Sequence, residues 1–169
     1  MIIAIVHADK KWGIGKGNDM MFSLPLDMKF FRKTTLGNTV VMGGNTLRSF
    51  PEQKPLKNRV NIVLSRGQVR DDCIIVRSYE ELKNEINKRE NAQEDVYIIG
   101  GGEIYKEMLP YCHYALVTKV DADGGAEVFF PNLDEHADFV CVDEGEPVED
   151  NGYVIRFTRY KNMAVKSLL

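Results

Sequence analysis

Apolar residues occur along the chain in short runs, each bounded by glycine or polar residues. Runs of this length that are rich in valine and isoleucine predict β-strands. Two of them, 62–64 and 96–99, are apolar at consecutive positions, which is typical of strands covered on both faces. The predicted strands are Ile2–His7, Thr39–Met42, Val60–Leu64, Cys73–Val76, Val96–Ile99, Ala115–Val120, Phe139–Val142 and Tyr153–Tyr160.

Segments between these strands carry apolar residues three or four positions apart, which predicts helices. Strands and helices alternate through the first two-thirds of the chain, so the predicted class is α/β with right-handed crossovers. In the last strand, Ile155 and Phe157 alternate with Arg156 and Thr158, which favours an antiparallel pair. We expect an open twisted sheet of about eight mostly parallel strands, with an antiparallel C-terminal edge and four helices on both faces. The predicted helices are Pro25–Leu36, Gly44–Phe50, Tyr79–Lys88 and Gly102–Leu109.

The composition predicts a single domain over residues 1–169, because no repeat, low-complexity tract or linker divides the chain. A net charge of −3 argues against a nucleic-acid partner. No apolar run approaches the roughly 18 residues of a membrane span, and the apolar start lacks the basic flank of a signal peptide. The three cysteines lack C-x-x-C spacing and the three histidines lack metal-ligand spacing. We therefore expect a cytoplasmic protein with free thiols and no metal.

Asp27 is an acidic residue on the apolar side of a predicted helix. It shares one helical face with Leu24, Met28 and Phe31 by the i, i+3, i+4, i+7 rule. A carboxylate there must be paired, because burial of an unpaired charge costs several kcal/mol. Pro25 fits the first helical position, so Asp27 could instead cap backbone N–H groups. This segment alone supports capping and ligand binding equally.

Glycines stand at the ends of two predicted strands. Gly43-Gly44 follows one strand, and Gly100-Gly101-Gly102 follows another. Open α/β sheets bind ligands at the carboxyl ends of their strands, where glycine lets backbone N–H groups approach a phosphate. A tight turn explains one such junction equally well, but two in one domain favour dinucleotide binding. Neither junction matches G-x-G-x-x-G or a P-loop.

The segment from Lys10 to Leu24, which leads into the Asp27 helix, is long for a connection. It has glycine at positions 13, 15 and 17, and it contains Trp12, Met20 and Phe22. Glycine hinges combined with large apolar groups are typical of a lid that closes on a flat ligand. A merely mobile surface loop would explain the glycines but not exposed aromatic residues.

Taken in order, these segments resemble the dihydrofolate reductase family, of the bacterial chromosomal type. The resemblance is colinear over nearly the whole chain, and the ordered set is specific although each motif alone is weak. The matching residues are Gly13-Ile14-Gly15, Asn18, Leu24-Pro25-x-Asp27, Phe31, Val40-Val41-Met42-Gly43, Thr46, Ser49, Arg59, Ile99-Gly100-Gly101-Gly102, Ile104-Tyr105, Thr118 and Phe130-Pro131.

The resemblance implies a dihydrofolate reductase-like fold and an NADPH-dependent oxidoreductase. In the implied reaction, NADPH delivers hydride to C6 of 7,8-dihydrofolate while N5 gains a proton, which gives tetrahydrofolate for one-carbon metabolism. The protein is expected to be a monomer that acts on this small molecule, without nucleic acid or membrane. One alternative is a pyrimidine reductase of riboflavin synthesis, which lacks the combination of Asp27 and Arg59. Another is a nucleotide-sensing module that is not an enzyme.

For the substrate, the resemblance makes Asp27 the catalytic carboxylate, which accepts hydrogen bonds from the pterin with Thr118 supporting it. Arg59 would hold the glutamate carboxylate through two parallel hydrogen bonds. The other implied substrate-binding residues are Ile5, Met28, Phe31, Phe50, Leu56 and Ile99.

For the cofactor, the resemblance implies contacts from the predicted lid, from both glycine junctions and from residues that follow other strands. It also implies a cis peptide bond between Gly100 and Gly101. The implied cofactor-binding residues are Val6, His7, Ile14, Gly15, Asn18, Met20, Gly43, Gly44, Asn45, Thr46, Ser49, Leu64, Ser65, Arg66, Arg77, Gly100, Gly101, Gly102, Glu103, Ile104 and Tyr105.

Some residues depart from the family pattern. Phe22 stands where bacterial members usually carry tryptophan, and His7 replaces a small residue that contacts the nicotinamide through its backbone. Gly44 and Glu103 replace basic residues around the adenosine 2′-phosphate, which leaves Arg66 and Arg77 as basic candidates. We therefore expect NADPH to be preferred over NADH by a smaller margin than in relatives with arginine after Gly43.

Overall fold

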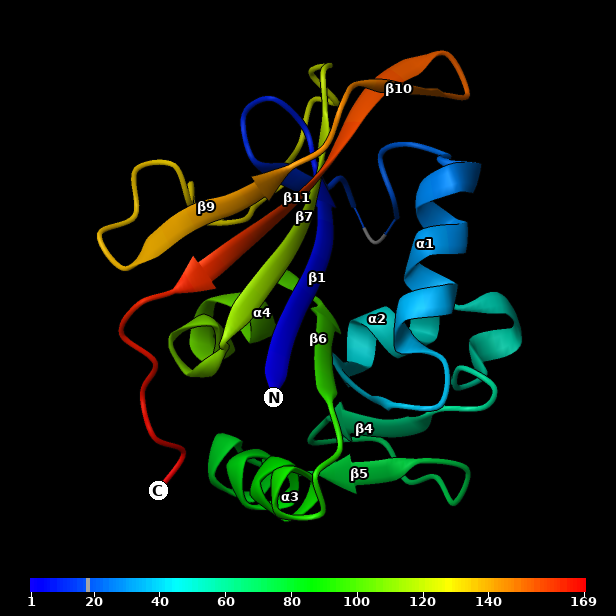
Figure 1. Cartoon of the computed structure of the whole chain (residues 1–169). Coiled ribbons are helices and arrows are strands. Elements are labelled where there is room, and N and C mark those ends of the chain that lie inside the picture. Colours follow the sequence, from blue (N-terminus) through cyan, green and yellow to red (C-terminus); the bar gives the residue numbers. More distant parts are fainter. Residues whose placement is uncertain (18) are drawn as a thin grey trace.

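The computed structural model in Figure 1 describes residues 1–17 and 19–169. Its centre is a nine-stranded sheet in the order β10-β11-β7-β1-β6-β3-β4-β5, with β9 also paired to β11. Neighbours from β7 to β5 run parallel, whereas β11 runs antiparallel to β7, β9 and β10. The strands are β1 (Ile2–Ala8), β3 (Thr39–Gly43), β4 (Val60–Leu64), β5 (Ile74–Val76), β6 (Val96–Gly100), β7 (Tyr114–Val120), β9 (Phe139–Glu144), β10 (Val148–Asp150) and β11 (Tyr153–Asn162).

The predicted α/β class, the mostly parallel sheet and its antiparallel C-terminal edge are confirmed. Three short strands were not predicted. Besides β10, these are β2 (Gly13–Gly15) and β8 (Val128–Phe129), which pair with each other in a separate two-stranded sheet. β2 and β10 contain no apolar run, and β8 is only two residues long, so the sequence pattern carries little sign of their pairing.

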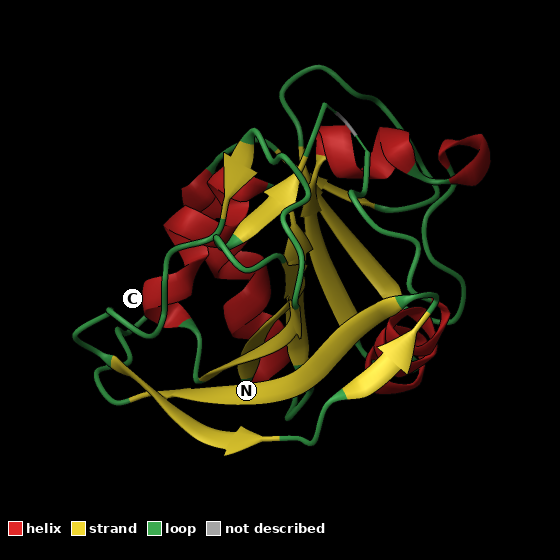
Figure 2. Ribbon diagram, turned by 90° about the horizontal axis from the view of Figure 1, so that it is seen from above, coloured by secondary structure: helices red, strands yellow, loops and turns green. Residues whose placement is uncertain are grey.

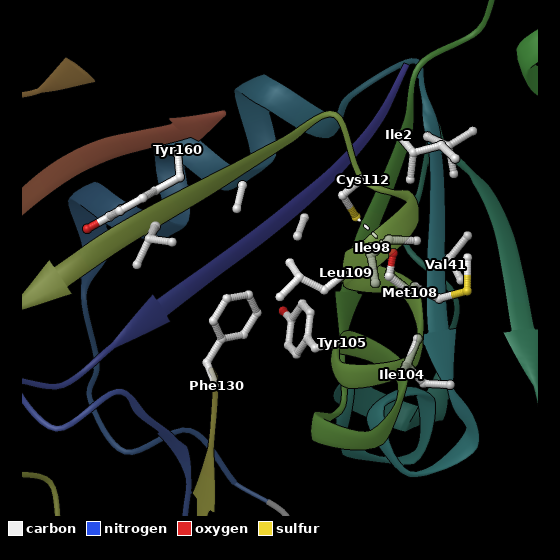
Figure 3. Packing of buried hydrophobic residues seen from close by; sticks show 14 of the residues in the cluster. Ile2, Val41, Ile98, Ile104, Tyr105, Met108, Leu109, Cys112, Phe130 and Tyr160 are labelled. Carbon is white, nitrogen blue, oxygen red and sulfur yellow. Dashed lines mark hydrogen bonds between the residues drawn. The ribbon is translucent and has the colours of Figure 1, made fainter. Parts of the chain in front are cut away.

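Helices cover both faces of the sheet, as predicted (Figure 2). On one face, Leu82 of α3 and Met108 of α4 belong to a core cluster with Ile2, Val41 and Ile98, part of which Figure 3 shows. On the other face, Leu47 of α2 joins Ile3, Val40 and Met42, against which Phe30 of α1 packs. Successive strand residues point to opposite faces, so the consecutive apolar residues fill two cores. The helices in the described residues are α1 (Pro25–Thr35), α2 (Gly44–Ser49), α3 (Tyr79–Asn91) and α4 (Gly102–Met108), with 3₁₀ turns at Pro51–Gln53 and Leu109–Tyr111.

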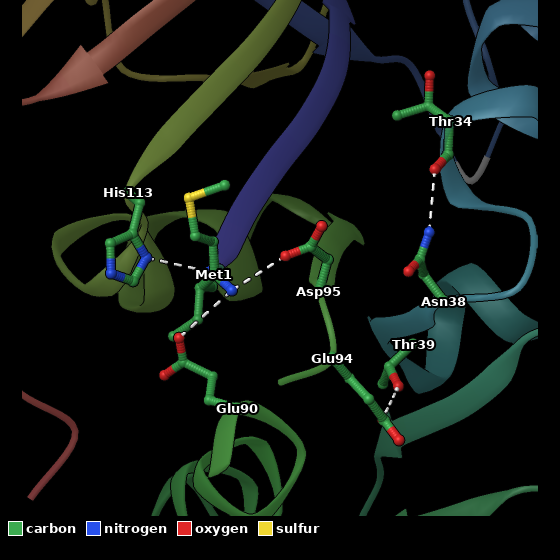
Figure 4. Close-up of polar contacts among 9 residues, drawn as sticks. Met1, Thr34, Asn38, Thr39, Glu90, Glu94, Asp95 and His113 are labelled. Carbon is green, nitrogen blue, oxygen red and sulfur yellow. Dashed lines mark hydrogen bonds and ion pairs between the residues drawn. The ribbon is translucent and has the colours of Figure 1, made fainter. Parts of the chain in front are cut away.

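Polar contacts tie together the amino ends of the parallel strands (Figure 4). The backbone N–H of Ile2 donates to His113 Nδ1 (3.0 Å), and the Thr39 hydroxyl donates to the Glu94 carboxylate (3.3 Å). These pairs join the starts of β1 and β3 to residues that precede β7 and β6. Open α/β sheets bind ligands at the opposite, carboxyl ends of their strands, so a ligand site is expected there. Within the described part of the chain, no helix is long and apolar enough to cross a membrane.

Candidate active site

Asp27 lies at the carboxyl ends of β1 and β7, where two side chains hold its carboxylate. The Thr118 hydroxyl donates to Asp27 Oδ1 over 2.7 Å, and His7 Nδ1 lies 3.2 Å from Asp27 Oδ2. His7 and Thr118 are paired residues of the neighbouring strands β1 and β7, so they reach the carboxylate side by side. Asp27 is only 9% exposed, and these hydrogen bonds compensate its burial.

A different carboxylate caps the helix that carries Asp27. Asp150, at the end of β10, is buried and accepts hydrogen bonds of 3.1 Å from the backbone N–H groups of both Leu26 and Asp27. The N-cap residue Leu24 provides no side-chain cap. Of the two roles that the sequence allowed for Asp27, capping is thus taken by Asp150, and the Asp27 carboxylate faces other side chains.

One face of α1 leads from this carboxylate to an arginine. Asp27, Phe31 and Thr35 are four residues apart, so they follow one another along the helix for about 12 Å. Arg59 Nη1 donates to the Thr35 hydroxyl (3.1 Å), and Arg59 Nε donates to the carbonyl of Lys57 (2.9 Å). The buried carboxylate and the guanidinium therefore stand at opposite ends of a single helical face.

Arg59 has the features of an anion-binding residue. Among the described residues, no acidic side chain forms an ion pair with it. Burial lowers the pKa of the Arg59 guanidinium, and the positive charge of nearby Arg32 lowers it further. Two like charges held close together without an acidic partner favour a bound carboxylate. Arg32 was missed in the sequence analysis, where its place in the last turn of α1 is equally explained by solvent exposure.

Apolar residues predicted for the substrate gather on the face of the sheet that α1 covers. They form or pack against one core cluster, and all but one are only partly buried. Met28, also predicted for this site, is 54% exposed, so the apolar stripe expected on α1 is interrupted there. The clustered residues are Ile5, Phe31, Phe50, Leu56 and Ile99.

The triple glycine at the end of β6 approaches α2 closely. The Gly100–Gly101 peptide bond is cis, as the resemblance implied, and Gly100 has φ of +143°. A Cβ at Gly100 would lie 3.2 Å from the Thr46 hydroxyl, so only glycine fits at this contact. Behind it, the Tyr105 hydroxyl donates to the carbonyl of Ile5 (2.7 Å). Burial, and to a smaller extent the charge of Asp27, raise the pKa of Tyr105.

A second group of predicted residues lines a shallow pocket of about 620 Å³ between α2 and the end of β4. Arg77, after β5, donates from Nη1 to the carbonyl of Ser65 (2.7 Å) beside this pocket. Arg48, which the sequence analysis missed, also lines it and donates to the side chain of Asn45. The other lining residues are Gly44, Asn45, Leu64, Ser65, Arg66, Gly67 and Gln68.

Residues 1–162 match the family model for dihydrofolate reductase. The chain belongs to the dihydrofolate reductase family. It is 30% identical over 164 residues to the dihydrofolate reductase of Bacillus subtilis (strain 168), covering 95% of this chain and 94% of that one. It is 34% identical over 166 residues to the enzyme of Staphylococcus haemolyticus, covering 96% of each. A solved structure of dihydrofolate reductase from Enterococcus faecalis, complexed with NADP(H) and RAB-propyl, superimposes with a TM-score of 0.83 at 26% identity, over 96% of each chain.

The remaining residues predicted to bind the cofactor fall into two groups. One group packs near the core or lies in β2, and the other is exposed or bonds only to its own helix. Val6 and Ile14 pack against the core beside Ile104 and Tyr105, and Gly15 lies in β2. Met20 is 56% exposed, Glu103 is exposed, and the Ser49 hydroxyl donates to the carbonyl of Thr46 (2.6 Å). The structure therefore does not bring Met20 or Glu103 to the described contacts of the site. Asn18 lies outside the described residues.

The segment predicted to be a lid differs from expectation in one respect. Its aromatic residues Trp12 and Phe22 are buried, so the argument from exposed aromatics was wrong. Trp12 stacks on Phe130, and Phe22 packs edge-on against Tyr153 with ring centroids 4.8 Å apart. Both rings instead anchor the segment to the protein. In the described residues, no cluster of three or more histidine, cysteine or acidic residues could hold a metal ion.

Proposed function

We propose that this protein reduces 7,8-dihydrofolate with NADPH, adding hydride at C6 and a proton at N5. The observation that carries the proposal is the placement of the Asp27 carboxylate and the Arg59 guanidinium at opposite ends of one face of α1. A pterin with amide and amino donors at one end, and a glutamate carboxylate at the other, has the matching chemistry. Apolar side chains between the two ends suit the flat rings of this substrate.

Asp27 performs the recognition at the pterin end. With Thr118 and His7 each occupying one lone pair, the carboxylate can still accept hydrogen bonds from the pterin 2-amino group and N3. Each such bond to a charged acceptor is worth roughly 1.5–3 kcal/mol. The negative charge also stabilises the cationic form of the pterin when N5 is protonated. The apolar cluster packs the rings, and Arg59 with Arg32 binds the carboxylate end.

The residues at the two glycine junctions fit a phosphorylated dinucleotide. Arg48, Arg66 and the Ser65 hydroxyl bring cationic and neutral donors to one pocket, which suits a phosphate group. Gly100 lies so close to Thr46 that a side chain there would crowd the Thr46 hydroxyl, which keeps the glycine backbone bare at this junction. When bound, NADPH supplies the hydride. The chain's own residues bind and orient both ligands, and Asp27 supplies the negative charge that stabilises the protonated pterin.

We further propose that the chain acts as a single domain and a monomer in the cytoplasm, without a nucleic-acid partner. Sedimentation measurements with and without NADPH would test the monomer. A shift to a dimer at assay concentrations would contradict it.

The reaction is tested by mixing the protein with NADPH and dihydrofolate and following the loss of NADPH absorbance. Asp27→Asn should lower kcat/KM at least about a hundredfold, because the charge that supports the reacting pterin is lost. Asp138→Asn, an exposed aspartate near β9, is the matched control and should leave turnover unchanged. Circular dichroism and NADPH binding should be normal in both variants. Absence of turnover in the unmodified protein would overturn the proposal, and near-normal turnover of Asp27→Asn would remove the catalytic role of Asp27.

A further inference from the structure

His7 contributes its side chain to the site, and not only its backbone. In β1 it is the partner of Thr118 in β7, and the two side chains bond to different oxygens of Asp27. The His7 side chain is only 12% exposed. Its ring also lies against Phe22, with centroids 6.2 Å apart. The two residues that depart most from the family pattern in this region therefore lie against each other, beside the carboxylate.

The second ring nitrogen of His7 is unusual. Nε2 is one of the few buried side-chain polar atoms that lack a hydrogen-bond partner among the described residues. When Nδ1–H donates to Asp27, Nε2 is an unpaired acceptor, and in the imidazolium it is an unpaired donor. Such an atom costs free energy that an apolar residue would avoid, so it calls for a functional explanation.

The other charged and titratable groups near His7 and Asp27 are bonded elsewhere. From α4, the Tyr105 hydroxyl is engaged with the Ile5 carbonyl. From β10, Asp150 is engaged with the N-terminus of α1. Within the described residues, no lysine or arginine forms an ion pair with Asp27. Among the described residues, His7 and Thr118 are therefore the side chains that contact this carboxylate.

We infer that His7 is a positioning residue of the reductase site, which orients the Asp27 carboxylate. This inference rests on the proposed function. His7 donates from Nδ1 to Oδ2, which fixes the carboxylate together with Thr118. The bond supplies beside Asp27 an N–H donor that Phe22 cannot provide.

Two variants test whether the Nδ1 hydrogen bond is what positions Asp27. His7→Asn places an amide N–H near the position of Nδ1, whereas His7→Leu fills the space without a donor. At pH 7, kcat/KM of His7→Leu should be about tenfold below that of His7→Asn, since a hydrogen bond to a charged group is lost. His136→Asn, in the loop before β9, should retain the unmodified kcat/KM.

A second measurement does not depend on turnover. The chain has three histidines, so long-range proton–nitrogen NMR spectra can follow each imidazole after assignment by single variants. In Asp27→Asn, the Nδ1 signal of His7 should shift, because its hydrogen-bond partner changes from a carboxylate to an amide. The ring signals of His136 should be unchanged. Equal kcat/KM values of His7→Asn and His7→Leu, or an unchanged His7 Nδ1 signal in Asp27→Asn, would overturn the inference. An unmodified protein without reductase activity would instead refute the proposed function, while the NMR spectra would still decide whether His7 Nδ1 bonds to Asp27.

Discussion

The carboxylate of Asp150 accepts a hydrogen bond of 3.1 Å from the backbone N–H of Asp27, although the two residues lie 123 positions apart in the sequence. A second bond of 3.1 Å joins Asp150 to the N–H of Leu26. The end of β10 thereby fixes the first turn of α1, and with it the direction in which the Asp27 side chain leaves the helix. One acidic residue thus caps the helix so that another, one turn inside it, remains available to a ligand.

Asp150→Ala should destabilise the protein by about 1–2 kcal/mol, because two N–H groups at the helix start lose their acceptor. It should also raise KM for dihydrofolate more than KM for NADPH, since only the Asp27 end of the site is loosened. Urea unfolding and steady-state kinetics measure the two effects. The matched control is Glu149→Ala, which removes the neighbouring exposed carboxylate of the same strand. Equal losses of stability in the two variants would show that the capping bonds are unimportant.

The sequence predicted the sheet well because strands buried on both faces are apolar at consecutive positions, as at Ile62–Leu64. It also selected Asp27 and Thr118, whose contact depends on the order of strands at the carboxyl edge, and Arg59, which reaches Thr35 at the far end of α1. The sequence could not decide between capping and binding for Asp27. That decision depends on Asp150, which belongs to a three-residue strand without an apolar run.

Residues whose role depends on side-chain direction could not be predicted from the sequence. His7 was assigned a backbone role, yet its ring contacts Asp27 because α1 packs across the end of β1. Arg48 lies one helical turn after Gly44, and nothing in the sequence shows that its guanidinium folds back toward that glycine. Such contacts depend on rotamers and on the packing of distant elements, which a residue pattern does not encode.

Arg59→Lys should weaken dihydrofolate binding roughly tenfold or more, because lysine cannot form two parallel hydrogen bonds to a carboxylate. Binding of a small diaminopyrimidine, which lacks the glutamate tail, should be unchanged. Isothermal titration with both ligands tests the difference. In the control Arg70→Lys, the altered residue pairs with Asp72 in the loop before β5, and both affinities should be retained. A parallel loss of both ligands in Arg59→Lys would indicate a structural role through Thr35.

Tyr79, the first residue of α3, should make the protein sensitive to alkaline pH. Burial, followed by the charges of Glu103 and Glu107, raises the pKa of its hydroxyl from 10.0 to about 12. Between these values the unfolded chain releases the proton while the folded protein keeps it, so stability falls as pH rises from 10 to 12. Below pH 10 both states are protonated, and this group adds no pH dependence.

Tyr79→Phe should therefore reduce the loss of unfolding free energy above pH 10, as measured by urea unfolding across that range. At pH 7 the variant should be about 1 kcal/mol more stable, because the Tyr79 hydroxyl is buried without a partner among the described residues. Replacement of both Glu103 and Glu107 by glutamine should also flatten the alkaline slope, but by less, since burial is the larger cause. An identical slope in Tyr79→Phe and the unmodified protein would refute this assignment.

We expect cofactor choice to depend on Arg48 as well as on the arginines that the sequence identified. A Cβ at Gly44 would lie 3.3 Å from Arg48 Nη1 and 3.3 Å from the Ser65 hydroxyl, so the guanidinium occupies the space beside this glycine. A 2′-phosphate carries nearly two negative charges and needs such donors. Arg48→Ala should therefore lower the ratio of kcat/KM for NADPH to that for NADH about tenfold.

Gly44→Arg tests whether an arginine side chain at position 44 can take the place of Arg48 in the preference for NADPH. In the unmodified protein, the new side chain must displace Arg48, so the preference for NADPH should change little. In the Arg48→Ala background, where that space is open, Gly44→Arg should restore the preference. Lys54→Ala removes an exposed lysine that pairs with Glu52 and serves as the control for a general loss of positive charge. A preference for NADPH that survives Arg48→Ala unchanged would assign the 2′-phosphate to Arg66 and Arg77 alone.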